Sequence, residues 1–265
     1  MEDSAVISPT KSVTSPLVKM VNIRKSYGAV NALSGVDFEI GRNEIVGLIG
    51  DNGAGKSTLI KVLTGVEQQS VGNIYWKDKE VTRHTVGNSR NMGIETVFQD
   101  RALAEKQNIW RNLFMGRELT YGRSGFIRLA ESQKEAIKLL KNMIGFTQVA
   151  LSANMGVMGL SGGEKQGIAI ARALYFDAQL IILDEPTNNL SLSETNKVLD
   201  FVRWVKDQDK SCIFITHSIY HVYSVAERFV ILDRGNTVGE FLKKDISLDG
   251  LVGKLEYVAK HGKLE

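Results

Sequence analysis

The sequence contains one glycine-rich segment of the kind that binds phosphate groups. It fits the pattern G-x-x-x-x-G-K-[ST] and lies between an apolar run, expected to be a strand, and a helical pattern that begins at Ser57. Its N–H groups can surround phosphate oxygens, Lys56 can reach the outer phosphates, and the Ser57 hydroxyl can bind Mg²⁺. An accidental glycine-rich turn is the alternative, and the strand-loop-helix order argues against it. We expect a nucleoside triphosphate to be bound by Gly50, Asp51, Asn52, Gly53, Ala54, Gly55, Lys56, Ser57 and Thr58.

Two acids follow the apolar run 180–183, at the end of a strand where open α/β sheets bind ligands. Asp184 can hold Mg²⁺ through water, and Glu185 can orient an attacking water as general base. Acids in a solvated loop at a strand end are the alternative explanation. Beside a phosphate loop, the pair favours hydrolysis of the triphosphate over binding alone.

A third motif is Leu160-Ser161-Gly162-Gly163-Glu164, here called the signature turn. Ser161 and Glu164 have the spacing of a capping box, which predicts that a helix begins here. The N-terminus of a helix carries partial positive charge and free N–H groups, so this turn can also face an anion. Helix capping with no ligand is the alternative, and these five residues alone leave both possibilities open.

The elements that must position these residues alternate between strands and helices. Apolar patterns predict strands at 18–24, 35–40, 44–49, 72–76, 94–98, 180–183 and 212–216. Helices are expected from Ser57 and at 131–144, 163–176, 192–205 and 220–226, with a hairpin-like pair around 233–235. This alternation predicts an α/β fold with a mostly parallel sheet covered on both faces.

Composition places the chain among folded globular proteins. It has 265 residues, 43% hydrophobic and 24% charged, with 33 basic and 30 acidic side chains giving a net charge of +3. That balance argues against a nucleic acid partner. No apolar run approaches the roughly 18 residues of a membrane-spanning helix. The single cysteine, Cys212, lies in an apolar run, which favours a core position and a reducing, cytoplasmic compartment.

With these motifs in this order, the sequence resembles the ABC ATPases over nearly the whole chain after residue 17. The family signature is L-S-G-G-Q, and this chain departs from it only at Glu164. The resemblance implies a P-loop NTPase core with a mostly parallel sheet, an N-terminal antiparallel β subdomain and a helical subdomain inserted at about 100–160. We therefore expect a flexible tail at 1–17 and a single ABC ATPase domain at 18–265.

Three further residues stand at family positions, and the resemblance implies a role for each. The counterpart of Tyr27 stacks on adenine, which suits an aromatic face. Gln99 would reach Mg²⁺ and the attacking water, and His217 would hydrogen-bond the terminal phosphate. Together with Glu185 these are the expected catalytic residues, and Ser57, Gln99 and Asp184 the expected Mg²⁺ ligands. In this family Ser161, Gly162, Gly163 and Glu164 would face ATP held by another subunit.

Several stretches resemble one branch of the family, the ATP-binding subunits of ribose- and fructose-type monosaccharide importers. They are the phosphate loop from Gly50 together with 93–99, 112–118 and 185–191. Many of those proteins carry two ATPase copies in one chain, whereas this chain ends after one and resembles the single-copy minority. The implied partners are a second copy or a homologous ATPase, a transmembrane permease and, indirectly, a sugar-binding protein, at the cytoplasmic face of the cell membrane.

Two positions depart from the family pattern. Most ABC ATPases have Asp where this chain has Ser191, and that Asp contacts the opposite subunit. Ser191 with Glu194 forms a second predicted capping box, so Ser191 has a local role at the start of a helix. Glu164 adds a carboxylate near the expected phosphates, where it would repel them unless it caps its own helix.

Two other classes of protein use the same phosphate loop. An ABC ATPase acting in translation or DNA repair would usually show tandem domains, coiled-coil inserts or a basic surface. A small-molecule kinase or a GTPase would leave the signature turn unexplained, and the guanine-reading pattern Asn-Lys-x-Asp does not occur here. An ATP-hydrolysing importer subunit with ATP and Mg²⁺ is therefore the leading expectation.

Overall fold

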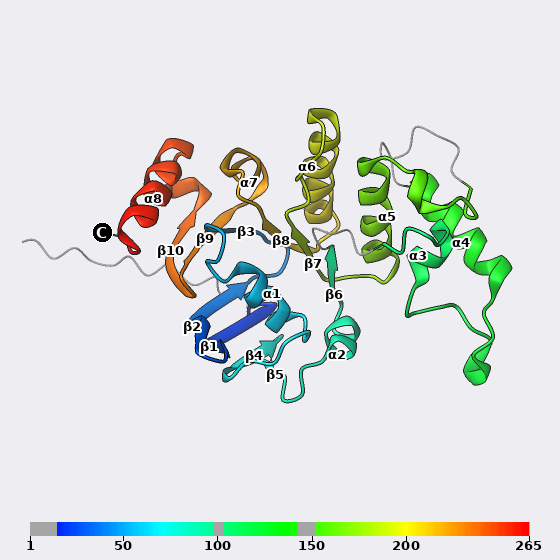
Figure 1. The fold of residues 1–265 in the computed structure, drawn as a ribbon, viewed down its shortest axis with the longest axis horizontal. Coiled ribbons are helices and arrows are strands. Elements are labelled where there is room, and N and C mark those ends of the chain that lie inside the picture. Colours follow the sequence, from blue (N-terminus) through cyan, green and yellow to red (C-terminus); the bar gives the residue numbers. More distant parts are fainter. Residues whose placement is uncertain (1–14, 98–102, 143–151, 265) are drawn as a thin grey trace, which may run out of the picture.

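The computed structural model describes residues 15–97, 103–142 and 152–264. Its centre is a six-stranded sheet with the order β10-β9-β3-β8-β7-β6, shown in Figure 1. The neighbouring strands from β9 to β6 pair in parallel, and β10 closes one edge as an antiparallel strand. The strands are β3 (Ile45–Ile49), β6 (Ile94–Val97), β7 (Leu180–Asp184), β8 (Ser211–Ile215), β9 (Arg228–Asp233) and β10 (Asn236–Leu242).

A second, antiparallel sheet is formed by the N-terminal segment, as expected. Its order is β2-β1-β4-β5, from β1 (Val18–Tyr27), β2 (Val30–Ile40), β4 (Val71–Trp76) and β5 (Lys79–Glu80). Leu17, the last residue of the expected tail, is buried and its N–H donates to the carbonyl of Ile40 at 2.8 Å. Its side chain therefore belongs to the folded part of the chain. Residues 1–14 of that tail lie outside the described residues.

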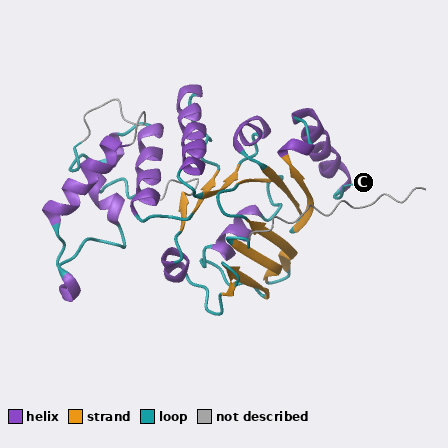
Figure 2. Ribbon diagram, turned by 180° about the vertical axis from the view of Figure 1, so that it is seen from behind, coloured by secondary structure: helices purple, strands orange, loops and turns teal. Residues whose placement is uncertain are grey.

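The central sheet has other elements of the fold on each face, as Figures 1 and 2 show. Along β3, Ile45 and Ile49 join one buried cluster, while Val46 and Leu48 join the other. This alternation follows from the two-residue period of a strand. On the first face lie α6 (Leu192–Asp207), α7 (Ile219–Val225) and α8 (Leu248–His261), and on the other lie α1 (Lys56–Leu63) and the antiparallel sheet.

The helical subdomain is inserted between β6 and β7. Its helices α3 (Ile109–Phe114), α4 (Leu129–Asn142) and α5 (Gly162–Tyr175) contact one another, while α2 (Val86–Asn91) packs against β6. Short 3₁₀ turns are η1 (Gly122–Ser124), η2 (Val157–Gly159) and η3 (Lys243–Asp245). The sequence patterns identified α4 and α5 but not α2, α3 or α8. Phe98, the expected last residue of the strand 94–98, lies outside the described residues.

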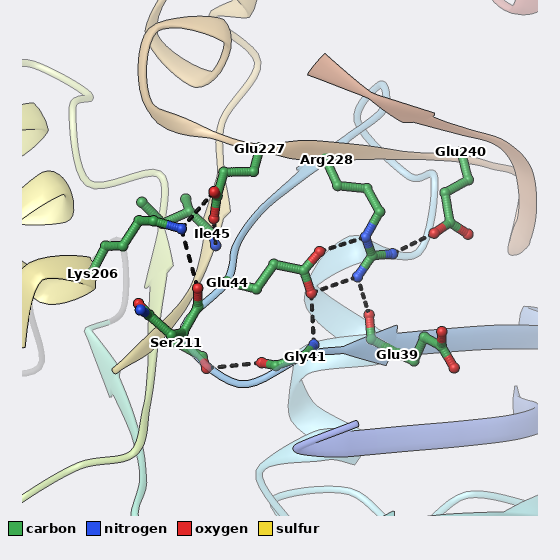
Figure 3. Close-up of polar contacts among 10 residues, drawn as sticks. Glu39, Gly41, Glu44, Ile45, Lys206, Ser211, Glu227, Arg228 and Glu240 are labelled. Carbon is green, nitrogen blue, oxygen red and sulfur yellow. Dashed lines mark hydrogen bonds and ion pairs between the residues drawn. The ribbon is translucent and has the colours of Figure 1, made fainter. Parts of the chain in front are cut away.

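A buried arginine joins the two sheets at the end of the central sheet where β3 begins. Arg228 Nε and Nη2 donate to the two Glu44 carboxylate oxygens at 2.7 and 2.9 Å, and Nη2 also donates to the carbonyl of Glu39 at 2.8 Å. Arg228 also pairs with Glu240, as Figure 3 shows. Burial acts to lower the pKa of Arg228, but the bonds and charges of Glu44 and Glu240 outweigh it and raise the pKa. The network fixes the antiparallel sheet to the core.

Candidate functional site

The predicted phosphate loop connects β3 to α1, as the sequence motif requires. Gly50 has φ 154°, and a Cβ there would lie 2.2 Å from the carbonyl oxygen of Leu232, so any larger residue would clash with the backbone. Gly55 ends the loop as the N-cap of α1 in the left-handed region, with φ 103°. The loop backbone is thus held close to the hairpin between β9 and β10, where the N–H of Gly235 donates to Ala54.

Lys56 is the buried cation of this loop. The residue is only 8% exposed. Its Nζ donates to the carbonyl oxygens of Gly50 at 2.5 Å and Asp51 at 3.0 Å. Burial lowers the pKa of Lys56, while the negative charges of Glu185, Asp184 and Asp51 act in the opposite direction. The predicted cation and both predicted acids therefore belong to one electrostatic cluster.

Asp184 and Glu185 lie at the carboxyl end of β7, the strand between β6 and β8. Asp184 is the last residue of β7 and pairs in register with Ile215 of β8. Burial raises the pKa of Asp184, the neighbouring Glu185 raises it further, and Lys56 opposes both. Glu185 has φ 49°, a left-handed conformation that is costly for a non-glycine residue, and its N–H donates to the carbonyl of Ile215 at 2.9 Å.

His217 lies beside Glu185, two residues beyond the end of β8. Its Nδ1 is 3.1 Å from Glu185 Oε2, with the His217 side chain 66% exposed and the Glu185 side chain only 12% exposed. A second histidine contact follows on α7, where His221 Nδ1 is 3.2 Å from Thr187 Oγ1. Burial lowers the pKa of His221, and His217 lowers it further. The sequence patterns did not single out Thr187 or His221, because their contact depends on the packing of α7.

Further predicted residues of the nucleotide site lie in α1 and at the end of β1. Ser57 and Thr58 lie in the first turn of α1. Tyr27 ends β1 with 42% of its surface exposed, and Lys25 Nζ is 5.0 Å from its ring centroid. Gln99 lies outside the described residues.

A cavity of about 90 Å³ lies next to the cluster. Its lining includes Asp51 and His217, and Leu255 and Val258 of α8 contribute apolar wall. The sequence patterns did not predict α8, and therefore did not predict this wall.

The signature turn forms a separate cluster on the inserted helices. Ser161 is the N-cap of α5, and the predicted capping box is present: Glu164 N–H donates to Ser161 Oγ at 3.2 Å, and Ser161 N–H donates to Glu164 Oε2 at 2.8 Å. Figure 1 shows α5 beside α6, away from α1. The second predicted capping box, Ser191 with Glu194, is also present at the start of α6. Glu194 in addition accepts a hydrogen bond from Gly163 N–H at 2.9 Å, a contact the sequence did not predict.

Comparison with known proteins identifies the family. A family model described as ABC transporter matches residues 33–188. The xylose/arabinose import ATP-binding protein XylG of Sulfolobus acidocaldarius is 40% identical over 236 residues, covering 89% of this chain and 92% of that protein. The ribose import ATP-binding protein RbsA of Yersinia pestis is 33% identical over 89% of this chain, which spans 46% of that protein.

Solved structures agree with the fold. A nucleotide-free ATP-binding cassette from an ABC transporter superposes with a TM-score of 0.77 at 23% identity, covering 92% of this chain and 98% of that one. A dimeric ATP-binding cassette in a post-hydrolysis state with ADP and Pi superposes with a TM-score of 0.73 at 26% identity, covering 86% and 100%.

The chain therefore belongs to the ABC transporter family. The fold is that of an ATP-binding cassette, so the expected P-loop core with an antiparallel β subdomain and an inserted helical subdomain is confirmed. The expected ABC ATPase class is confirmed as well. In the part of the chain that the structure describes, no helix is both long enough and apolar enough to span a membrane.

Proposed function

We propose that this chain is the ATP-binding and ATP-hydrolysing subunit of an ABC importer for a monosaccharide. The names of its relatives support this function, since the similar proteins from Sulfolobus acidocaldarius and Yersinia pestis are import subunits for xylose or arabinose and for ribose. The similar galactofuranose transporter ATP-binding protein of Escherichia coli K12 adds a third sugar. These relatives favour import over the alternative roles in translation or DNA repair.

ATP fits the phosphate loop because the loop offers one buried cation and a closely packed glycine backbone. Lys56 is held within the loop by the carbonyl groups of Gly50 and Asp51, from which its three donor hydrogens can turn toward phosphate oxygens. The exposed ring of Tyr27 provides a face for adenine. The other residues proposed to contact ATP on this chain are Asn52, Gly53, Ala54, Gly55, Ser57 and Thr58.

The donor set also fits Mg²⁺, which takes oxygen ligands and is usually bound by one or two protein groups together with substrate phosphates. We assign this role to the Ser57 hydroxyl, the Asp184 carboxylate and the Gln99 side chain. The raised pKa of the half-buried Asp184 is consistent with a carboxylate placed to receive a cation. When bound, Mg²⁺ would neutralise negative charge on the phosphates.

Hydrolysis requires a base beside the terminal phosphate, and Glu185 is that base in our proposal. The single observation that carries this assignment is the contact of Glu185 Oε2 with His217 Nδ1 at 3.1 Å, at the ends of two adjacent parallel strands. His217 restrains the carboxylate, and its exposed ring remains available to a phosphate oxygen. Glu185 can then accept a proton from the attacking water.

Two copies would complete each ATP site. The signature turn lies at the start of α5, apart from α1, and in our proposal it faces a nucleotide bound to another chain. The similar cassette solved as a dimer with ADP and Pi supports such pairing. The proposed partners are a second copy or a homologous ATPase, a permease at the cytoplasmic face of the membrane and, through it, a sugar-binding protein.

Uptake of labelled sugars tests the function. A strain lacking this gene should lose uptake of at least one of xylose, arabinose, ribose or galactofuranose, and the wild-type gene should restore it. Glu185→Gln should not restore uptake, whereas Glu256→Gln, which replaces an exposed carboxylate on α8, should restore it. Normal uptake of all four sugars in the deletion strain would contradict the proposal.

A further inference from the structure

One carboxylate bonds to the first turns of two helices. Glu194 Oε2 accepts hydrogen bonds from Ser191 N–H at 3.0 Å and from Ser191 Oγ at 2.9 Å, at the start of α6. Its other oxygen, Oε1, accepts a hydrogen bond from Gly163 N–H at 2.9 Å, in the first turn of α5. Glu194 therefore connects the signature turn to the loop that runs from Glu185 to Ser191.

The glycine at position 163 is explained by this contact. A Cβ on Gly163 would lie 2.6 Å from Glu194 Oε1 and 2.9 Å from Glu194 Cγ, well inside van der Waals distance. Any larger residue would push the carboxylate away from α5. The hydrogen bond between Gly163 and Glu194, in this geometry, therefore requires a glycine at position 163.

The contact also changes the electrostatics of the signature turn. The amides of Ser161, Gly163 and Glu164 already have acceptors within the chain, from Glu164, Glu194 and Ser161 respectively. A phosphate approaching this turn would have to share the Gly163 amide with a carboxylate of the same sign. The phosphate and the Glu194 carboxylate would repel each other at this short range. The N-terminus of α5 would also stabilise the phosphate less well while the carboxylate is bound there.

We propose that Glu194 is a positioning residue that couples the signature turn to the loop after Glu185, and that its charge opposes a phosphate of ATP held by a second copy. This inference rests on the proposed pairing of two copies. When a phosphate oxygen accepts from the Gly163 N–H, Glu194 Oε1 loses that hydrogen bond. The Glu194 carboxylate then moves relative to Ser191, to which its other oxygen is bonded. Occupation of one ATP site is thereby signalled to the loop that leads back to Glu185 on the same chain.

Two substitutions separate the charge from the link. In Glu194→Gln the amide oxygen can still accept from Gly163 N–H and the amide nitrogen can donate to Ser191 Oγ, so the charge is lost and a link between the two helix starts remains, although the hydrogen bond from Ser191 N–H is lost. In Glu194→Ala both are lost. Glu80→Gln is the matched control, because Glu80 is exposed on β5 of the antiparallel sheet, away from α5 and α6.

The first measurement is the dissociation constant of the Mg-ATP dimer, in a Glu185→Gln background that blocks turnover. Both Glu194 variants should lower it by about threefold relative to that background alone, as expected when an anion is removed from a helix N-terminus. The control should leave it unchanged. An unchanged constant for Glu194→Gln would overturn the proposed charge effect.

The second measurement is turnover per dimer with Glu185 intact. Glu194→Ala should turn over more slowly than the wild type because the loop after Glu185 has lost its anchor, and Glu194→Gln should restore most of the rate. ATP affinity of the single chain should not change, because the phosphate loop is untouched. Equal turnover in the alanine variant and the wild type would overturn the coupling.

Amide hydrogen exchange without nucleotide tests the link independently of pairing. The Gly163 amide should exchange several-fold faster in Glu194→Ala than in the wild type and in Glu194→Gln. Equal exchange in all three would overturn the link itself. A strictly monomeric Glu185→Gln protein in Mg-ATP would instead overturn the proposed pairing and the charge effect with it. The exchange experiment would still test the link between Gly163 and Glu194, because it does not depend on pairing.

Discussion

Glu185 Oε2 and His217 Nδ1 lie 3.1 Å apart although the two residues are 32 positions apart in the sequence. The contact arises from the sheet: β7 and β8 are adjacent parallel strands, and Asp184 at the end of β7 pairs with Ile215 at the end of β8. Glu185 follows the end of β7 and His217 follows the end of β8, so both side chains lie at the same edge of the sheet. The backbone of Glu185 is left-handed, with φ 49°, at the point where the chain leaves β7.

Replacing Glu185 by Gln should slow ATP turnover by about a hundredfold or more, because an amide cannot accept the proton of the attacking water. ATP affinity should remain, since the phosphate loop is unchanged. Steady-state phosphate release and a nucleotide-binding titration measure the two effects. Normal turnover would assign the base to another residue.

Ser191→Ala should lower the free energy of unfolding by roughly 1 kcal/mol, the usual cost of losing an N-cap. The structure shows the cap directly, with Glu194 N–H donating to Ser191 Oγ at 3.3 Å. Urea unfolding of the monomer measures this change. Ser193→Ala, at an exposed position in the first turn of α6, is the control and should stay close to the wild type. Equal stability of the two variants would show that the cap contributes nothing.

Arg228→Met should destabilise the fold by about 3 kcal/mol or more, because it leaves Glu44 in a half-buried position without its cation. The arginine side chain is only 8% exposed and binds two carboxylates. Arg203→Met is the control, since the Arg203 side chain is 50% exposed and pairs with Asp200 of the same helix, α6. Chemical denaturation measures the free energy of unfolding of both variants. A similar small decrease in the two variants would contradict the proposed role of the network in fixing the two sheets.

Stability should fall in mild acid because of a buried neutral histidine. His84 is 2% exposed, its Nε2 lies 2.5 Å from the carbonyl of Leu63, and burial lowers its pKa from 6.5. A lowered folded-state pKa means that the unfolded chain takes up the proton first. The stabilisation is therefore present above pH 6.5 and is lost as the pH falls through the folded-state pKa.

Urea unfolding at about pH 7.5 and about pH 5.5 measures this effect. The wild type should lose more free energy of unfolding between the two conditions than His84→Gln, even if the variant is less stable at both. The same loss in both proteins would show that His84 does not govern the acid sensitivity.

The motifs that the sequence predicted well are those whose contacts are local. Both capping boxes join residues three apart, so the spacing of Ser161 with Glu164 and of Ser191 with Glu194 was sufficient to predict them. The bond between Gly163 and Glu194 spans 31 positions and depends on the packing of α5 beside α6. A single sequence holds no signal for such a pair.

The helix α8 was missed for a different reason. It contains Gly250 and Gly253, and glycine lowers helix propensity by close to 1 kcal/mol per residue. Leu251 and Val258 are buried in the core cluster on one face of the central sheet, and this packing supplies the stability that the local sequence lacks. The apolar wall of the cavity beside His217 was missed along with the helix.

The central claim is that two copies of this chain enclose ATP between the phosphate loop of one and the signature turn of the other. Sedimentation equilibrium of Glu185→Gln, with and without Mg-ATP, tests it most directly. Glu185→Gln should be a dimer with Mg-ATP and a monomer without it, while the double variant Lys56→Ala with Glu185→Gln should stay monomeric in both conditions. If Glu185→Gln remained monomeric at saturating Mg-ATP, two copies would not enclose ATP in this way.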